Sequence, residues 1–223
     1  MAVAECDKNV TRGQVVKGDK GTGRLSGSRQ IRRGYNGDMQ SAFATYLMGV
    51  SAGHAWMVGC AALYLAWWAV FFRPRESKLH GVEYVVGVAC ILGAVACGLV
   101  GVVGLAQNAG ALPHTVNGGI VALVAVATYV VFAAVTARVF NRPVTTELAL
   151  IVAWAALEWF VLDGVAGTGA SAVLPVLLVA AACVFSMICY VLYYRLHGWK
   201  AFWDGCGPLI AAGVVSLAFA ALL

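Results

Sequence analysis

The feature of this sequence that most limits its possible folds is a series of six long apolar runs. They lie at about 52–72, 84–106, 118–137, 148–166, 172–194 and 206–223. Each is close to the roughly 20 residues that an α-helix needs to cross the hydrocarbon core of a bilayer. A membrane-spanning β-barrel is built instead from shorter segments of alternating polarity. The runs therefore predict an all-α integral membrane protein with six transmembrane helices, which short loops of about five to eleven residues join into three antiparallel hairpins.

The first 38 residues differ in composition from the rest of the chain. They hold eight of its 15 Lys and Arg residues and almost no large apolar side chains, so they cannot bury enough surface to offset the entropy cost of folding. We expect 1–38 to be a disordered basic leader that binds no nucleic acid, and 39–223 to be the six-helix transmembrane domain. The mildly apolar stretch 39–51 is too short to span a bilayer, and it forms either an interfacial helix or an extension of the first span.

Lysine and arginine residues near the predicted spans are confined to alternate connections. They are Arg73, Arg75, Lys78, Arg138, Arg142, Arg195 and Lys200. Because positively charged loops remain on the cytoplasmic side, we expect a multi-pass protein of the cell membrane with 73–83, 138–147 and 195–205 in the cytoplasm. This orientation would require translocation of the basic leader. We therefore expect that synthesis begins at Met39 in the native cell and that the leader is not translated there.

One ionisable residue lies deep inside a predicted span. Glu158 follows Glu147 by eleven residues, which is about 16 Å along a helix and near the middle of the bilayer. At about 100° per residue, Trp154 lies on the same helix face as both carboxylates. A carboxylate at this depth is costly and usually functional, so it either binds a cation or proton or donates one hydrogen bond as a neutral acid. Its ionised form needs a cation or a partner such as His54.

The remaining polar residues within spans are less specific. We expect His54 at the outer start of the first span, where it pairs with Glu158, ligates haem or lies at the interface. Asp163 is expected near the outer end of its helix, as a cap or in contact with water. The candidate substrate-binding or proton-binding residues are thus Glu158, Trp154, Glu147, His54 and Asp163. Ser186, Tyr190, Tyr193 and Tyr194 could line a cavity, but an interfacial aromatic girdle is the simpler interpretation.

The sequence favours neither a cofactor nor a metal site. A haem with two histidine ligands needs a second histidine inside a span, and the sequence has none there. The seven cysteines contain no C-x-x-C pair, and the phosphate loop and HExxH signatures are missing. These observations leave catalysis undecided and favour a protein that is not an enzyme.

Small residues at fourfold spacing in the second span, Ala89, Gly93, Cys97 and Gly101, allow another helix to approach closely. This stripe predicts helix packing, and it could also serve a second copy or a partner membrane subunit, besides the lipid bilayer. Taken together, the sequence favours a small transporter or channel-like protein with a carboxylate at the midplane. The alternatives are an anchor or accessory subunit of a redox or other membrane complex, and a membrane scaffold without chemistry.

Overall fold

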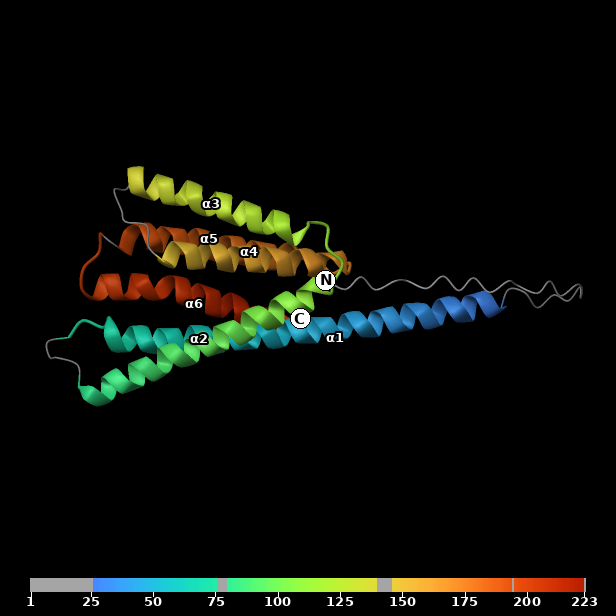
Figure 1. Cartoon of the computed structure of the whole chain (residues 1–223), viewed down its shortest axis with the longest axis horizontal. Coiled ribbons are helices and arrows are strands. Elements are labelled where there is room, and N and C mark those ends of the chain that lie inside the picture. Colours follow the sequence, from blue (N-terminus) through green and yellow to red (C-terminus); the bar gives the residue numbers. More distant parts are fainter. Residues whose placement is uncertain (1–25, 76–79, 140–145, 194, 223) are drawn as a thin grey trace, which may run out of the picture. The chain divides into compact units, whose positions relative to one another are not determined.

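The computed structural model describes residues 26–75, 80–139, 146–193 and 195–222, and within these ranges the chain is helical apart from its connections (Figure 1). The helices are α1 (Ser26–Phe71), α2 (Gly81–Gly110), α3 (Gly118–Val139), α4 (Thr146–Gly167), α5 (Val173–Tyr193) and α6 (Trp199–Leu222). Each contains a segment long and apolar enough to cross a membrane, which in α1 is Ser41–Phe71. The prediction of an all-α protein with six transmembrane helices is confirmed. The chain is a polytopic membrane protein whose spans contact the lipid bilayer.

The first helix begins earlier than the sequence analysis expected. Of the two alternatives for 39–51, the structure has the extension, because these residues belong to α1. Residues 26–38, which we expected to be disordered, are helical as well, and 1–25 lie outside the described residues. Once a helix has formed, each added residue brings a backbone hydrogen bond without a new nucleation cost. The chain divides after Met39 into two compact units, and the second, Gln40–Leu223, contains the six candidate spans.

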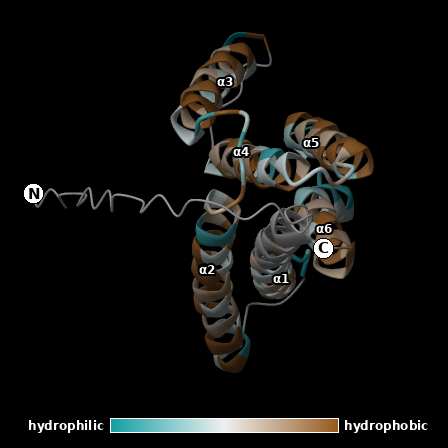
Figure 2. Cartoon of the chain, turned by 90° about the vertical axis from the view of Figure 1, so that its right-hand side faces the viewer, coloured by the Kyte–Doolittle hydropathy of each residue, from teal (hydrophilic) through white to brown (hydrophobic). Residues whose placement is uncertain are grey.

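Helix α4 lies in the middle of the bundle (Figure 2). It packs against α2, α3 and α5, and α5 packs along α6. Helix α1 is joined to α6 at two places along its span. Ser51 Oγ donates a hydrogen bond to the Ala220 carbonyl at 2.8 Å, and Trp68 Nε1 donates to the Phe202 carbonyl at 3.2 Å. This arrangement brings α1 and α4 close enough for side chains from both to meet.

Helices α1 and α2 approach each other through small residues. A methyl group at Gly53 would lie 2.8 Å from a side-chain carbon of α2, and one at Gly101 would lie 3.1 Å from the Gly53 carbonyl oxygen. Gly93 and Cys97, from the same predicted stripe, also face side chains of α1. Ala89, its fourth member, is exposed. Most of the stripe therefore packs within this chain.

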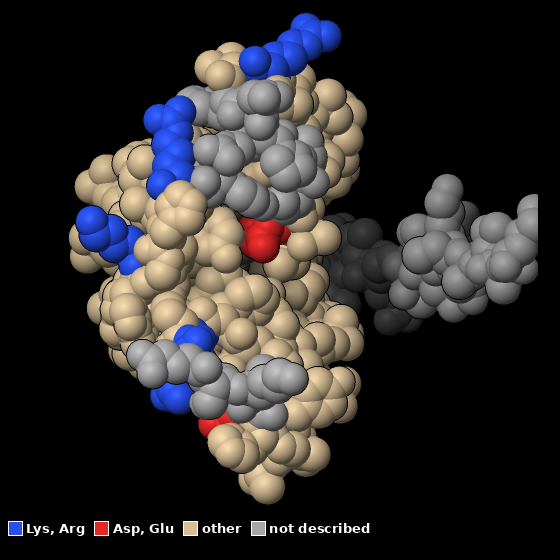
Figure 3. Space-filling view, turned by 90° about the vertical axis from the view of Figure 1, so that its left-hand side faces the viewer, with Lys and Arg blue, Asp and Glu red and all other residues tan. Residues whose placement is uncertain are grey.

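The described Lys and Arg residues of Gln40–Leu223 gather at one end of the bundle (Figure 3). They are Arg73, Arg75, Arg138, Arg195 and Lys200, whereas Lys78 and Arg142 lie outside the described residues. At this basic end α1, α3 and α5 finish and α2, α4 and α6 begin. The connections at the opposite end, 111–117 and 168–172, contain neither Lys nor Arg. The charge asymmetry read from the sequence is therefore also an asymmetry in space.

Candidate functional site

A histidine and a glutamate meet inside the bundle. His54 Nε2 lies 3.1 Å from Glu158 Oε2, and both side chains are completely buried. The expectation that His54 lies at the outer start of a span is wrong, because the span begins at Ser41, thirteen residues earlier. The early start of α1 thus places His54 at the depth of Glu158 on α4.

The hydrogen bonds around His54 determine how many protons the pair holds. His54 Nδ1 lies 3.0 Å from the Val50 carbonyl oxygen, which can only accept, so Nδ1 carries a proton and donates it. The contact between Nε2 and Glu158 needs one further proton, on either the histidine or the glutamate. In both arrangements the pair is neutral overall. Loss of that proton would leave a buried negative charge beside a nitrogen lone pair, so the buried pair is a site for one proton.

The second carboxyl oxygen of Glu158 has no partner. Oε1 is buried without a hydrogen bond to any residue that the structure describes. On another side, the edge of Phe219 packs against the His54 ring at 5.1 Å between ring centroids. Buried polar atoms without a partner are rare, and they commonly mark a place where an ion, a water molecule or a proton takes part in function. The pair is therefore incompletely satisfied by the protein itself.

A cavity of about 230 Å³ opens between α1, α4, α5 and α6, in the half of the bundle nearer the basic end. Its aromatic and polar lining residues are Tyr64, Trp68, Glu147, Trp154, Ser186, Tyr190, Tyr193, Asp204 and Ser216. Glu147 lies in the first turn of α4 and is exposed, so the cavity reaches the surface at the basic end. From Glu147 to Trp154 it follows α4 for seven residues, or about 10 Å.

The inner end of this cavity approaches the buried pair. On α1 it is lined by Met57, one turn after His54. On α4 it is lined by Trp154, one turn before Glu158, and the buried Ser216 lines it on α6. The indole N–H of Trp154 is buried and makes no hydrogen bond within the described ranges. Polar groups therefore lead from the basic end to within one helical turn of the pair.

Two carboxylates, Glu147 and Asp204, line the cavity, and among the lining residues that the structure describes there is no Lys, Arg or His. Asp204 Oδ2 is buried without a hydrogen-bond partner among the described residues. The Cys189 thiol donates a hydrogen bond to the Asp204 carboxyl group. Pro208 has no N–H, so the backbone carbonyl of Asp204, four residues earlier, lacks its usual helical donor. The cavity wall therefore offers several acceptors.

Apolar side chains close off the other side of the pair. A buried cluster from α1, α2, α4 and the α2–α3 connection comprises Val50, Leu105, Ala109, Leu112, Val161 and Val165. Val50 precedes His54 by one turn on α1, and Val161 follows Glu158 by one turn on α4. We call this cluster the apolar layer. Within the described part of the chain, the cavity approaches the pair from the basic end, and the apolar layer separates the pair from the opposite end.

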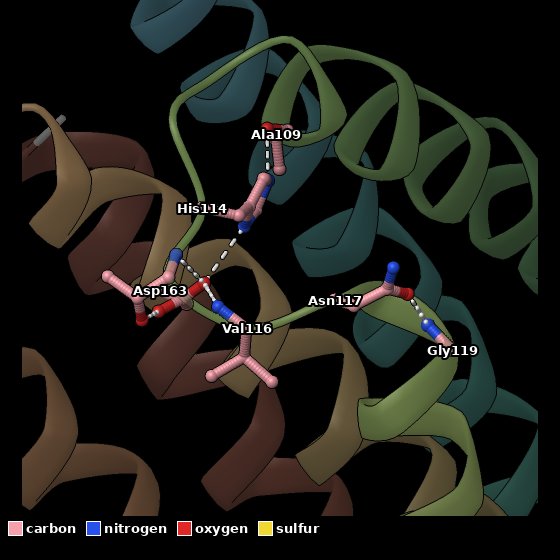
Figure 4. A network of polar contacts seen from close by, with 7 residues as sticks. Ala109, His114, Val116, Asn117, Gly119 and Asp163 are labelled. Atoms are coloured by element: carbon pink, nitrogen blue, oxygen red, sulfur yellow. Dashed lines mark hydrogen bonds and ion pairs between the residues drawn. The ribbon is translucent and has the colours of Figure 1, made fainter.

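At the opposite end, Asp163 holds the α2–α3 connection against α4 (Figure 4). Its carboxylate accepts hydrogen bonds from the backbone N–H groups of Thr115 and Val116 at 3.0 and 3.1 Å, and from the Thr115 hydroxyl. His114 Nδ1 lies 3.1 Å from Asp163 Oδ2, and Nε2 lies 2.8 Å from the Ala109 carbonyl oxygen. A carboxylate with so many donors is best satisfied in its ionised form, and each nitrogen of His114 faces an acceptor, the carboxylate or the Ala109 carbonyl. We call these four residues, 114–116 and Asp163, the loop clamp.

The structure gathers four of the five predicted site residues along one path. His54 and Glu158 are in contact, and Trp154 and Glu147 line the cavity beside them. Asp163 lies apart from them, in the loop clamp. Ser186, Tyr190 and Tyr193 line the cavity, contrary to the preferred interpretation as an interfacial girdle, and Tyr194 lies outside the described residues.

Sequence reasoning missed Asp204. We expected the last span to begin at Cys206, but α6 begins at Trp199 and brings Asp204 into the helix. The sequence signal was the pair Trp199 and Trp203, because aromatic residues of this kind mark the membrane interface and hence an earlier helix start.

The arrangement can hold one exchangeable proton at the buried pair and a small molecule in the cavity beside it. Among the residues that the structure describes, no group of three or more His, Cys, Asp or Glu side chains is placed to hold a metal ion. Comparison of the chain with known protein families, with curated proteins and with solved structures finds no match.

Proposed function

We propose that the protein is a small proton-coupled transporter in which the His54–Glu158 pair binds the proton. The observation that carries this proposal is a completely buried contact between His54 and Glu158, with one carboxyl oxygen unpartnered among the described residues, inside a six-helix bundle. Ionisable groups at membrane depth are expensive, and they are typical of proton and substrate pathways. The pair holds one proton in either of two neutral arrangements, which suits a group that must bind and release that proton.

The cavity and the apolar layer support the same proposal. A transporter exposes its central site to one side of the membrane at a time. Here the cavity reaches the surface at the basic end, whereas Val161 and its neighbours lie between the pair and the opposite end. By the positive-inside rule, we assign the basic end to the cytoplasm and the protein to the cell membrane, in a conformation open toward the cytoplasm. The cavity then holds the solute and the pair holds the coupling proton.

Purified protein in liposomes tests this function. A pH step is applied across the membrane, a trapped pH dye reports proton entry, and valinomycin with K⁺ removes the membrane potential. Under this proposal, the proton of the pair exchanges slowly with both sides of the membrane in the absence of solute. We therefore expect faster dissipation with the native protein than with Glu158→Gln, whose amide can bond His54 Nε2 but cannot exchange a proton. Glu83→Gln is the matched control, because Glu83 pairs with Arg75 at the basic end, outside the cavity. Equal rates for the native protein and Glu158→Gln would refute the proposal and favour a scaffold or anchor.

A further inference from the structure

We propose that the solute bound in the cavity is a small organic cation, an amine or quaternary ammonium compound that enters from the basic end. This inference rests on the proposed function, since it names the substrate class of the same site. It is carried by the charge of the lining, by its aromatic walls and by its size.

The charge of the lining selects a positively charged ligand. Two of the described lining residues, Glu147 and Asp204, are acidic, and none of the described ones is Lys, Arg or His. Both carboxylates lie within electrostatic range of Tyr193, so they act on the same region of the cavity. Asp204 Oδ2 is a buried acceptor without a hydrogen-bond partner among the described residues. An anion would meet repulsion from both acids, with no compensating cation among the described lining residues.

The aromatic residues select an organic cation over a simple metal ion. The lining contains two indoles and three phenols, from Trp68, Trp154, Tyr64, Tyr190 and Tyr193. Aromatic rings attract ammonium groups through the negative potential of their faces, and several rings together recognise quaternary ammonium compounds. Trp68 is held rigidly in this wall. Its N–H donates to the Phe202 carbonyl, and a methyl group at Gly205 would lie 2.3 Å from its ring.

The size of the cavity limits the ligand to a small compound. A volume of about 230 Å³ holds roughly eight groups the size of a water molecule, each taking about 30 Å³. Choline, which has about that number of non-hydrogen atoms, fits this limit, whereas most drug-sized compounds need a pocket of about 300 Å³ or more. Choline therefore serves as the probe cation, without being assigned as the natural substrate.

Equilibrium dialysis on the purified full-length protein, in a detergent free of choline lipids, compares probes of one shape and different charge. Choline is positive, 3,3-dimethylbutan-1-ol is its neutral analogue, and 3,3-dimethylbutanoate is the negative one. We expect choline to bind at least tenfold more tightly than the other two, because only the positive probe is attracted by the carboxylates and by the faces of the aromatic rings, and one desolvated cation–π contact contributes at least about tenfold in affinity. Equal binding of the three probes, or no binding of choline up to about 10 mM, would overturn the inference.

A choline headgroup of a lipid carries the same ammonium group, and phosphocholine distinguishes this source. Its phosphate would lie near the carboxylates, so we expect weaker binding than for choline. Tighter binding of phosphocholine would overturn the assignment to a free cation and indicate a lipid headgroup site.

Variants then locate the binding site. We expect Asp204→Asn to weaken choline binding at least tenfold and the control Glu83→Gln to leave it unchanged. If Asp204→Asn reduces the monodisperse yield of the protein, Glu147→Gln at the exposed mouth replaces it, with the same direction of change. Unchanged choline binding in both cavity variants would overturn the assignment. Because dialysis requires no proton movement and the liposome assay contains no organic cation, a failure of this inference and a failure of the proposed function are distinguishable.

Discussion

Replacement of the buried pair by apolar side chains should cost less stability than removal of either partner alone. His54→Phe retains a ring against Phe219, but it leaves the Glu158 carboxyl group with no partner for Oε2, in addition to the unpartnered Oε1. Glu158→Leu leaves only the neutral His54 Nε2 without a partner. The double variant removes both polar groups at once and keeps a similar side-chain volume. The three variants with the native protein form a double-mutant cycle.

The magnitudes follow from complete burial of both side chains. Removing one partner of a buried ion pair costs about 3–5 kcal/mol, which is the expected cost of His54→Phe. A single unpartnered neutral acceptor costs about 1–3 kcal/mol, the range expected for Glu158→Leu. Replacing a whole buried pair by apolar groups is often neutral or stabilising, so the double variant should lie within about 1 kcal/mol of the native protein.

Thermal unfolding in detergent, followed by tryptophan fluorescence, measures these differences. For a chain of this length each kcal/mol shifts the midpoint by about 2–4 °C, so we expect His54→Phe to lose roughly 10 °C and the double variant to recover most of that loss. Additive losses in the double variant would refute the reasoning, because they would mean that the two side chains do not depend on each other for stability.

Three further results are expected. Asp163→Asn should destabilise the protein by about 2 kcal/mol, because the loop clamp loses its charge and gains an amide that faces N–H donors. Amide hydrogen exchange of residues 112–117 should then accelerate, whereas that of α6 should remain unchanged. Gly167→Ala should lower the midpoint of thermal unfolding, because the added methyl group would lie 1.9 Å from the Pro113 carbonyl oxygen. The control Gly81→Ala should be neutral or slightly stabilising, because its methyl group would have no neighbouring atom within 4 Å. The proposed orientation can be tested in a variant without native cysteines. In that background, Asn117→Cys should react with an impermeant maleimide added outside cells, and Arg195→Cys should not. The reverse pattern would contradict the proposed orientation.

The spans were predictable from the sequence because a long apolar run has few alternatives in a bilayer. Helices must satisfy their own backbone hydrogen bonds, and this requirement removes most other structures. The start of the first helix was less predictable. The segment before Ala52 is only mildly apolar, and a hydropathy argument does not show how far a helix continues beyond the apolar run that nucleates it.

The candidate site was predictable only within single helices. The spacing of Glu147, Trp154 and Glu158 places them on one face of α4, and this periodicity needs no tertiary information. The partnership of Glu158 with His54 depends on how α1 and α4 pack, so the sequence offered it as one alternative among several. For Asp204, the missing information was the start of α6, since the seven residues between the expected start at Cys206 and the observed start at Trp199 decide whether its side chain lies in a loop or in a cavity wall.

The positions of the apolar layer and the loop clamp determine what must move if the pair is to reach the opposite end. The apolar layer joins α1 and α2 to α4, and the clamp joins the α2–α3 connection to the same helix. Access from the opposite end therefore requires α4 to separate from α1 and α2 there, which breaks both contacts together. Burying the apolar layer and forming the charged clamp each favour the closed arrangement. A clamp variant such as Asp163→Asn should then shift the equilibrium toward the opposite-facing conformation as well as lower stability, because it weakens a contact made only while that end is closed.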